Sequence, residues 1–163
     1  MSTGYAELHA LSNFSFLRGA SHPEELVARA DELGYKALAL TDECSLAGVV
    51  RAHEEARNRQ LSLIIGSEFR LEQGDRLVLL ATDRQAYAGL SALITRARRG
   101  ADKGQYRLTP EDLDDLPGCL ALLHPDDPDD RERLACHVER FSGRLWLEAN
   151  RLLLGNEPRY LYS

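Results

Sequence analysis

Short apolar runs alternate with amphipathic segments along most of this chain, and that alternation limits the possible folds more than any other feature. The runs at 36–40 and 119–123 are almost wholly apolar, as is typical of parallel strands buried on both faces. Between such runs, apolar residues recur at helical spacing, as in Leu26, Val27 and Ala30. Repeated strand–helix units predict an α/β fold in which right-handed crossovers join parallel strands. Periodicity alone does not separate an open doubly wound sheet from a barrel.

Turn and capping signals place the boundaries of these elements. Pro23 suits the first position of a helix, and Ser21 with Glu24 resembles a capping box. No GxGxxG loop and no P-loop is present, which argues against nucleotide-binding Rossmann and P-loop folds. The expected strands span 5–10, 36–40, 61–65, 76–81, 119–123 and 144–147, and the expected helices begin near 23, 45, 86, 109 and 131.

Composition narrows the class of protein. A chain of 163 residues, of which 44% are hydrophobic and 28% charged, can form one domain with its own core. The formal net charge of -6 argues against the main duplex-binding surface, because phosphate contacts need clustered Lys and Arg. The one basic cluster, Arg96, Arg98, Arg99 and Lys103, is interpreted as a solvated helix end.

The sequence also predicts the cellular location of the protein. No apolar run reaches the roughly 18 to 20 residues of a membrane span, so no membrane partner is expected. Residues 1–7 lack the features of a signal peptide. The three cysteines form no CxxC pair, so reduced thiols are expected. Together these features predict a cytoplasmic location.

Imidazole and carboxylate groups stand at the ends of several expected strands. They are His9 after the first strand, Asp42 and Glu43 after the second, Glu68 after the third and His124 at the end of the strand from 119. Ligands of parallel α/β folds bind at the carboxyl ends of the strands. Such side chains are ligands for a divalent metal such as Zn or Mn. These strand ends are therefore a candidate metal site.

Each of these residues also has a structural interpretation. A histidine at a strand end is often a hydrogen-bonded structural residue, and Asp42 is placed to cap a helix that begins at Ser45. Of the other histidines, His22 and His137 are expected to be exposed beside helices, and His53 to be packed on an apolar helix face. The residues alone leave the metal-binding and structural interpretations open.

Four segments carry a family resemblance in the order and spacing of known motifs. They are LHALSNFSFLRGA at 8–20, ALTDECSLAG at 39–48, IIGSEF at 64–69 and LVLLA at 77–81. They resemble the motifs of the PHP domain of bacterial C-family DNA polymerases. The residues within these motifs resemble those of the error-prone, damage-tolerant branch more than those of its paralogue, the replicative polymerase III alpha subunit.

The resemblance implies a particular architecture. PHP domains are distorted (β/α) barrels of seven strands, so the implied fold is a PHP-type barrel of parallel strands that is truncated before its last strands. The resemblance implies that residues 1–150 are the N-terminal portion of the PHP domain. It leaves 151–163 as a C-terminal tail of unclear structure.

The chain departs from the family pattern at metal-binding positions. Histidines of the family are replaced by Leu11, Glu43 and Arg76. A leucine cannot coordinate a metal, and an arginine brings positive charge to a cation site. The late D-x-H motif of the family is not found in the chain. The resemblance therefore implies a vestigial metal site with the candidates His9, Asp42, Glu43 and Glu68, no catalytic residue, and no cofactor in this chain.

The resemblance also implies a function for the parent protein. That parent is a DNA-directed DNA polymerase, a nucleotidyltransferase of translesion synthesis and DNA repair, with two Mg ions on palm aspartates that this chain lacks. The expected role of the chain is a metal-free structural scaffold that packs against the palm and thumb. It meets DNA through the parent, with translesion accessory proteins as further candidate partners. The alternatives are a Zn- or Mn-dependent phosphoesterase or 3′-5′ proofreading nuclease, and a stand-alone partner-binding protein.

Overall fold

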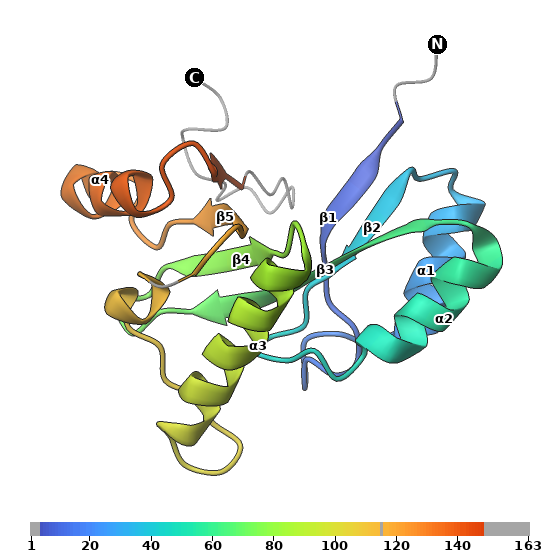
Figure 1. Cartoon of the computed structure of the whole chain (residues 1–163), viewed down its shortest axis with the longest axis horizontal. Helices are drawn as coiled ribbons and strands as arrows, with labels where there is room; N and C mark the ends of the chain where they lie inside the picture. The colour runs from blue at the N-terminus through green and yellow to red at the C-terminus, as the bar shows by residue number, and fades with distance from the viewer. Residues whose placement is uncertain (1–3, 115, 149–163) are drawn as a thin grey trace.

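The computed structural model describes residues 4–114 and 116–148, in which strands and helices alternate largely as predicted (Figure 1). The predicted tail at 151–163 lies outside the described residues. The strands are β1 (Ala6–Ala10), β2 (Ala37–Leu40), β3 (Ser62–Arg70), β4 (Arg76–Leu80), β5 (Leu120–His124) and β6 (Leu145–Leu147). The helices are α1 (Pro23–Glu32), α2 (Val49–Arg59), α3 (Arg84–Arg99), the short 3-10 helix η1 (Pro110–Leu113) and α4 (Arg131–Arg140).

The six strands form one curled sheet in the order β1-β2-β3-β4-β5-β6. Neighbours in space are therefore neighbours in sequence, which is the order of a barrel rather than of a doubly wound sheet. Three of the pairings, β1 with β2, β2 with β3 and β5 with β6, are parallel. The predicted fold class is confirmed: the chain is an α/β half-barrel consistent with part of a PHP barrel.

The direction of β4 differs from the prediction that all strands are parallel. β4 pairs antiparallel with both β3 and β5. The cause is the short connection at 71–75, which contains Gly74 at φ 107 and joins β3 to β4 as a hairpin instead of through a helix. A tight turn reverses the chain, whereas a parallel return needs a long crossover.

β3 joins the two halves of the sheet (Figure 1). Its first residues, 62–65, pair with β2, and its last, 66–70, pair with β4. At the change of partner, a Cβ atom on Gly66 would lie 2.7 Å from the carbonyl oxygen of Leu79. Glycine is therefore required here by the close approach of β4.

Side chains along β4 alternate between two apolar clusters. Leu77 and Leu79 are buried beneath α3, where they belong to the largest cluster of the molecule. Val78 and Leu80 face the opposite side of the sheet. A separate cluster lies between β2 and the helices α1 and α2, around residues such as Leu40. The period of two along the strand thus gives β4 two buried faces.

The side of the sheet opposite α3 is hollow. A pocket of about 800 Å³ lies between β1 and β6, the two edge strands of the described sheet. Its lining is mainly apolar and includes Leu8, Ile64, Leu120, Leu122 and Trp146. The concave face of the half-barrel is therefore open along the gap between its two edges.

α1 begins at Pro23, as predicted, whereas α2 begins later than predicted. α1 has His22 as its N-cap residue, and Glu25 accepts the backbone N–H of His22 at 2.7 Å, one residue beyond the predicted capping pair. α2 begins at Val49 instead of Ser45. The backbone N–H groups of Cys44 and Ser45 donate to the Glu68 carbonyl and the Ser67 hydroxyl. The segment is tied to β3 and is not free to join the helix.

Two predictions for histidines are wrong. His53 is exposed, because Val49, Ala52 and Ala56 form the buried face of α2. His137 is buried, because α4 lies over the β3–β4 turn and brings its Nε2 atom within 3.0 Å of the Asp75 carboxylate. None of the described helices is long and apolar enough to cross a membrane.

Candidate functional site

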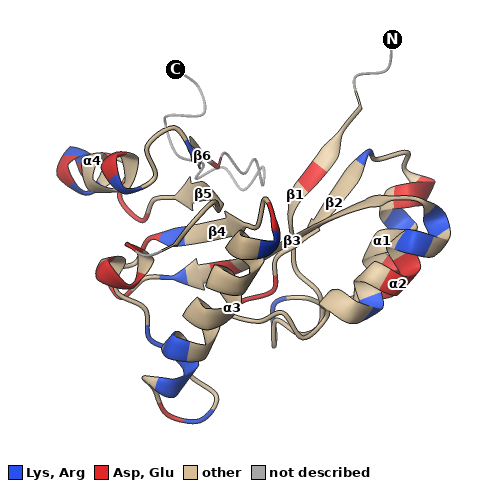
Figure 2. Ribbon diagram, in the orientation of Figure 1, with Lys and Arg blue, Asp and Glu red and all other residues tan. Residues whose placement is uncertain are grey.

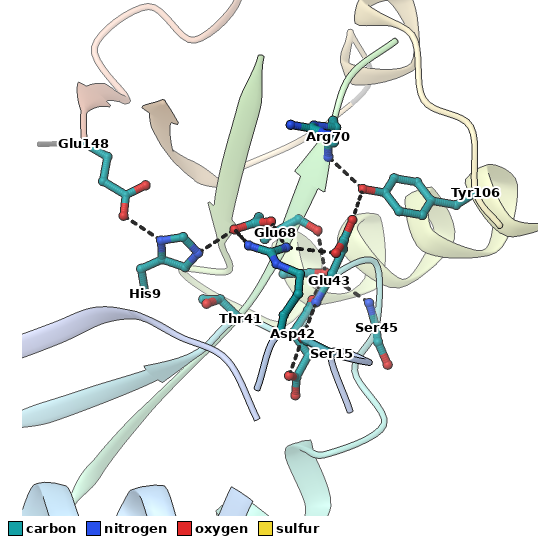
Figure 3. A network of polar contacts seen from close by, with 12 residues as sticks. His9, Ser15, Thr41, Asp42, Glu43, Ser45, Glu68, Arg70, Tyr106 and Glu148 are labelled. Carbon is teal, nitrogen blue, oxygen red and sulfur yellow. Dashed lines mark hydrogen bonds and ion pairs between the residues drawn. The ribbon is translucent and has the colours of Figure 1, made fainter. Parts of the chain in front are cut away.

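The carboxyl ends of β1, β2 and β3 bring most of the predicted site residues together (Figure 3). The backbone of Thr41, at the end of β2, bonds to Ala10 of β1 on one side and to Glu68 of β3 on the other. This register places His9, Glu43 and Glu68 in one polar network. The Asp42 carboxylate lies at the same edge but bonds to Ser12 and Ser15 in the loop after β1. Of the four vestigial metal-site candidates, the structure therefore brings three together, and their assignment to a metal site stays a prediction.

His9 lies between two carboxylates. Its Nε2 atom is 2.8 Å from Glu68, and its Nδ1 atom is 2.5 Å from Glu148, which follows β6. Burial alone would lower the pKa of His9, but the hydrogen bonds to Glu148 and Glu68 outweigh burial and raise it to about 9. His9 is therefore a protonated cation at neutral pH, with both ring nitrogens donating.

Arg18 reaches into the same cluster from the loop between β1 and α1. Its guanidinium donates to both oxygens of Glu68, and one of its nitrogens also lies 2.8 Å from a Glu43 oxygen. Burial would raise the pKa of Glu68, whose side chain is fully buried, yet the bonds from His9 and Arg18 lower it to about 2. The same ion pairs raise the pKa of Arg18. The cluster thus holds its own two cations.

Tyr106 and Arg98 hold Glu43 in position. The Tyr106 hydroxyl donates to Glu43 at 2.8 Å and accepts the backbone N–H of Arg70. Burial and this bond to Glu43 raise the pKa of Tyr106. Arg98 donates to the carbonyl oxygens of Glu43 and Cys44 and lies over the Tyr106 ring. Basic residues gather at the last turn of α3 (Figure 2). Arg98 in that turn supports the site, whereas the sequence predicted only a solvated helix end.

Asp42 has a different structural role from the predicted cap. Its carboxylate accepts hydrogen bonds from the backbone N–H and hydroxyl of Ser12 and from the hydroxyl of Ser15, at 2.7 to 2.8 Å. The N-cap residue of α2 is Gly48, and no side chain caps that helix. The prediction that Asp42 caps the second helix is wrong, because all the described bonds of its carboxylate go to the loop after β1.

Comparison with known proteins identifies the family. The sequence profile of the PHP domain matches residues 7–136. The chain belongs to the PHP domain family. It is 58% identical over 155 residues to the error-prone DNA polymerase of Methylococcus capsulatus, covering 94% of this chain and 15% of that protein. It is 62% identical over 146 residues to that of Pseudomonas aeruginosa, covering 89% and 14%.

These relatives confirm the resemblance seen in the motifs. This chain spans only about 15% of the length of the polymerases it matches, and it matches their N-terminal part. Among solved structures it is similar to an amidohydrolase from Chromobacterium violaceum with bound sulfate and no metal. That match has 29% identity and a TM-score of 0.51, and covers 60% of this chain and 34% of the other.

A second solved structure bears on the fold alone. It is a protein of Bifidobacterium adolescentis described as a metal-dependent phosphoesterase. It is 23% identical to this chain with a TM-score of 0.50, again over 60% of this chain and 34% of the other. The partial coverage agrees with a half-barrel that corresponds to part of a larger barrel.

The donor set of this PHP domain does not fit a divalent metal. Glu43 and Glu68 are both bonded to Arg18, whose positive charge lies where a metal would have to bind them. Leu11 offers no ligand atom, and Arg76 pairs in register with His124, where its charge helps burial to lower the pKa of that histidine. Within 4–114 and 116–148, no group of three or more His, Cys, Asp or Glu side chains is arranged to hold a metal ion.

Three residues of the network were not singled out from the sequence. Glu148 follows the last strand, so the same strand-end rule that found Glu68 would have found it. Arg18 lies within the first family motif, but nothing in that motif shows which way its side chain turns. Tyr106 lies in the loop between α3 and η1 and carries no local signal, since only the packing of that loop against Glu43 defines its role.

Proposed function

We propose that this chain is the PHP domain of an error-prone DNA polymerase and serves that enzyme as a metal-free structural scaffold. The supporting observation is the position of Arg18, which bonds to Glu43 and Glu68 at once. With protonated His9, it neutralises the buried carboxylate without a metal ion. The named relatives are error-prone DNA polymerases. The proposed parent enzyme is one as well, and extends primers in translesion synthesis and DNA repair in the bacterial cytoplasm.

The proposed scaffold comprises residues 1–150 and packs against the palm and thumb of the same polymerase chain. DNA is contacted by the parent enzyme, consistent with the net charge of -6 on this domain. The Mg ions of the polymerase reaction belong to the palm, so the chain by itself is inactive in primer extension. Translesion accessory proteins are further proposed partners of the whole enzyme.

Elemental analysis of the purified chain tests this proposal. After dialysis we expect well under one equivalent of Zn, Mn or Fe, because Arg18 occupies the carboxylates that a metal would need. One tightly retained equivalent that disappears in His9→Ala would overturn the scaffold and support the metal-dependent phosphoesterase.

A nuclease assay provides an independent test. The chain should release no nucleotides from the 3′ end of single-stranded DNA in the presence of Mn²⁺. Release that is abolished by Glu68→Ala, but kept by the matched surface variant Glu32→Ala, would establish a proofreading nuclease instead. Glu32 lies at the exposed end of α1, where its described ion pair is with Arg29.

A further inference from the structure

The loop between β1 and α1 displays apolar side chains to solvent. Phe16 is 83% exposed and Leu17 is 90% exposed, the highest values among the large hydrophobic residues of the described chain. Residues 13–17 include no charged side chain. Single exposed hydrophobic residues are common on protein surfaces, so exposure alone assigns no role to this pair.

Hydrogen bonds to Asp42 hold the backbone of the same loop in place. Asp42, itself buried, accepts three hydrogen bonds from Ser12 and Ser15. The backbone N–H groups of Arg18 and Gly19 both donate to the Ser15 carbonyl at 3.0 Å, which closes a tight turn under Phe16 and Leu17. The backbone that carries the pair is therefore held in one conformation, so little backbone entropy remains to be lost when a partner binds.

The backbone at Leu17 is strained. Its φ is 60°, in the left-handed region that a side chain with a Cβ atom adopts only at a cost. This conformation turns the following residue, Arg18, inward to Glu68. A glycine would provide the same turn without that cost. Because the Leu17 side chain is 90% exposed, packing inside the domain does not account for a leucine at this position.

We propose that Phe16 and Leu17 form a docking knob that inserts into an apolar pocket on the remainder of the polymerase chain. The inference rests on the proposed scaffold function and names the surface through which it acts. The chain covers only 14% to 16% of the related polymerases, so most of the enzyme lies outside it. Two large uncharged side chains on a preorganised loop match a buried apolar pocket, the usual environment of an interface hot spot.

Cysteine labelling in the whole enzyme tests this inference. The Pseudomonas aeruginosa polymerase is made with its matching segment replaced by this chain, in a Cys136→Ser background that removes the exposed native thiol while Cys44 and Cys119 stay buried. Phe16→Cys is then labelled with a maleimide in the polymerase and in the isolated chain. Val50→Cys serves as the matched control, because Val50 is 68% exposed on α2.

We expect labelling of Phe16→Cys to be slower in the polymerase than in the isolated chain by about tenfold or more, as for a site that reacts only after local opening. Val50→Cys should react equally in both. Equal rates for Phe16→Cys would overturn the knob. If Val50→Cys alone is slowed, the domain docks through another face and only the knob fails, whereas a retained metal ion would defeat the proposed function itself.

Leu17→Gly separates docking from folding. The isolated chain should keep or raise its melting temperature, because glycine relieves the strain at φ 60°. The same substitution should speed labelling of Phe16→Cys in the polymerase. A lowered melting temperature of the isolated chain would make Leu17 a structural residue and overturn the inference. A dimer of the isolated chain that Leu17→Gly abolishes would likewise overturn it, by assigning the knob to self-association.

Discussion

Glu68 is fully buried at the centre of the cluster, where a carboxylate without a partner would be strongly unfavourable. Two cations stabilise it. His9 contacts one of its oxygens, and Arg18 contacts both. Arg18 also links Glu68 to Glu43, so a single guanidinium connects the end of β3 to the segment after β2.

Removing that guanidinium should destabilise the domain. Arg18→Ala leaves Glu68 with His9 as its one remaining cation, and we expect the free energy of unfolding to fall by about 2 kcal/mol. Arg29→Ala is the control, because Arg29 pairs with Glu32 on an exposed helix surface, and it should change stability by less than about 0.5 kcal/mol. Urea unfolding measures both. Equal small effects would show that Arg18 does not stabilise the buried carboxylate.

The raised pKa of His9 predicts a loss of stability at alkaline pH. A histidine whose folded pKa is about 9 and whose ordinary value is 6.5 stabilises the fold fully below pH 6.5. That contribution is lost as the pH rises from 6.5 to about 9, with an expected fall in unfolding free energy of about 2 kcal/mol. His9→Gln should lack this decline. A wild-type stability that stays flat over the same interval would contradict protonation of His9.

Glu68 has the opposite dependence. Its folded pKa of about 2 lies below the ordinary 4.5, so its contribution is present above pH 4.5 and is lost as the pH falls toward 2. Stability should therefore decline on both sides of a plateau between about pH 4.5 and pH 6.5.

The candidate site could be predicted from sequence only in part. His9, Glu43 and Glu68 follow from one rule, that parallel strands end at a common edge. The rule does not identify Arg18, because Arg18 lies in a loop. The direction of the Arg18 side chain depends on the left-handed backbone at Leu17. No periodicity encodes such a turn when the residue is not glycine.

At the scale of elements, the loop after β1 is fixed by Asp42 rather than by regular structure. Each oxygen of this carboxylate accepts from Ser12, and one of them also accepts from Ser15. The Ser15 hydroxyl in turn accepts the backbone N–H of Glu43 at 2.9 Å. The loop that positions Arg18 is thus anchored to the end of β2.

Substitution of Asp42 should release this loop. Asp42→Ala leaves three donors without their acceptor and should lower the free energy of unfolding by about 3 kcal/mol. Asp42→Asn keeps one oxygen, and the Ser12 hydroxyl can rotate to accept, so a loss of about 1 kcal/mol is expected. Proteolytic cleavage after Phe16 should accelerate most in Asp42→Ala. Unchanged cleavage would mean that Asp42 does not hold the loop.

β3 depends on a glycine at the point where it changes partner. In Gly66→Ala the added carbon would meet the Leu79 carbonyl oxygen at 2.7 Å, and we expect a loss of about 2 kcal/mol. Gly100→Ala is the control, because its added carbon would meet nothing closer than 3.4 Å at a φ of -82°. Denaturant melts compare the two. A tolerated Gly66→Ala would show that β4 can move away from β3.

The order of elements could be predicted because hydrophobic periodicity is local. The direction of β4 was predicted wrongly, because the rule for repeated strand–helix units was extended to two strands that a connection of only five residues joins. The late start of α2 has a similar cause. The segment after Asp42 bonds to β3, a contact between residues more than 20 positions apart.

At the scale of the whole molecule, the described sheet is a barrel with one side open. β1 and β6 are its edges, and the mainly apolar pocket lies between them. His9 and Glu148 connect these edges at one end of the gap. Such a surface suits a domain that functions inside a larger chain, because exposed strand edges and apolar hollows favour association.

The central claim is that side-chain cations take the place of a metal in this PHP domain, and thermal melts with and without excess Mn²⁺ or Zn²⁺ test it most directly. A bound metal would raise the melting temperature by mass action. Because Arg18 already pairs with Glu43 and Glu68, we predict no rise for the wild-type chain with either ion. A clear metal-dependent rise in the wild type that vanishes in Glu68→Gln would contradict the account.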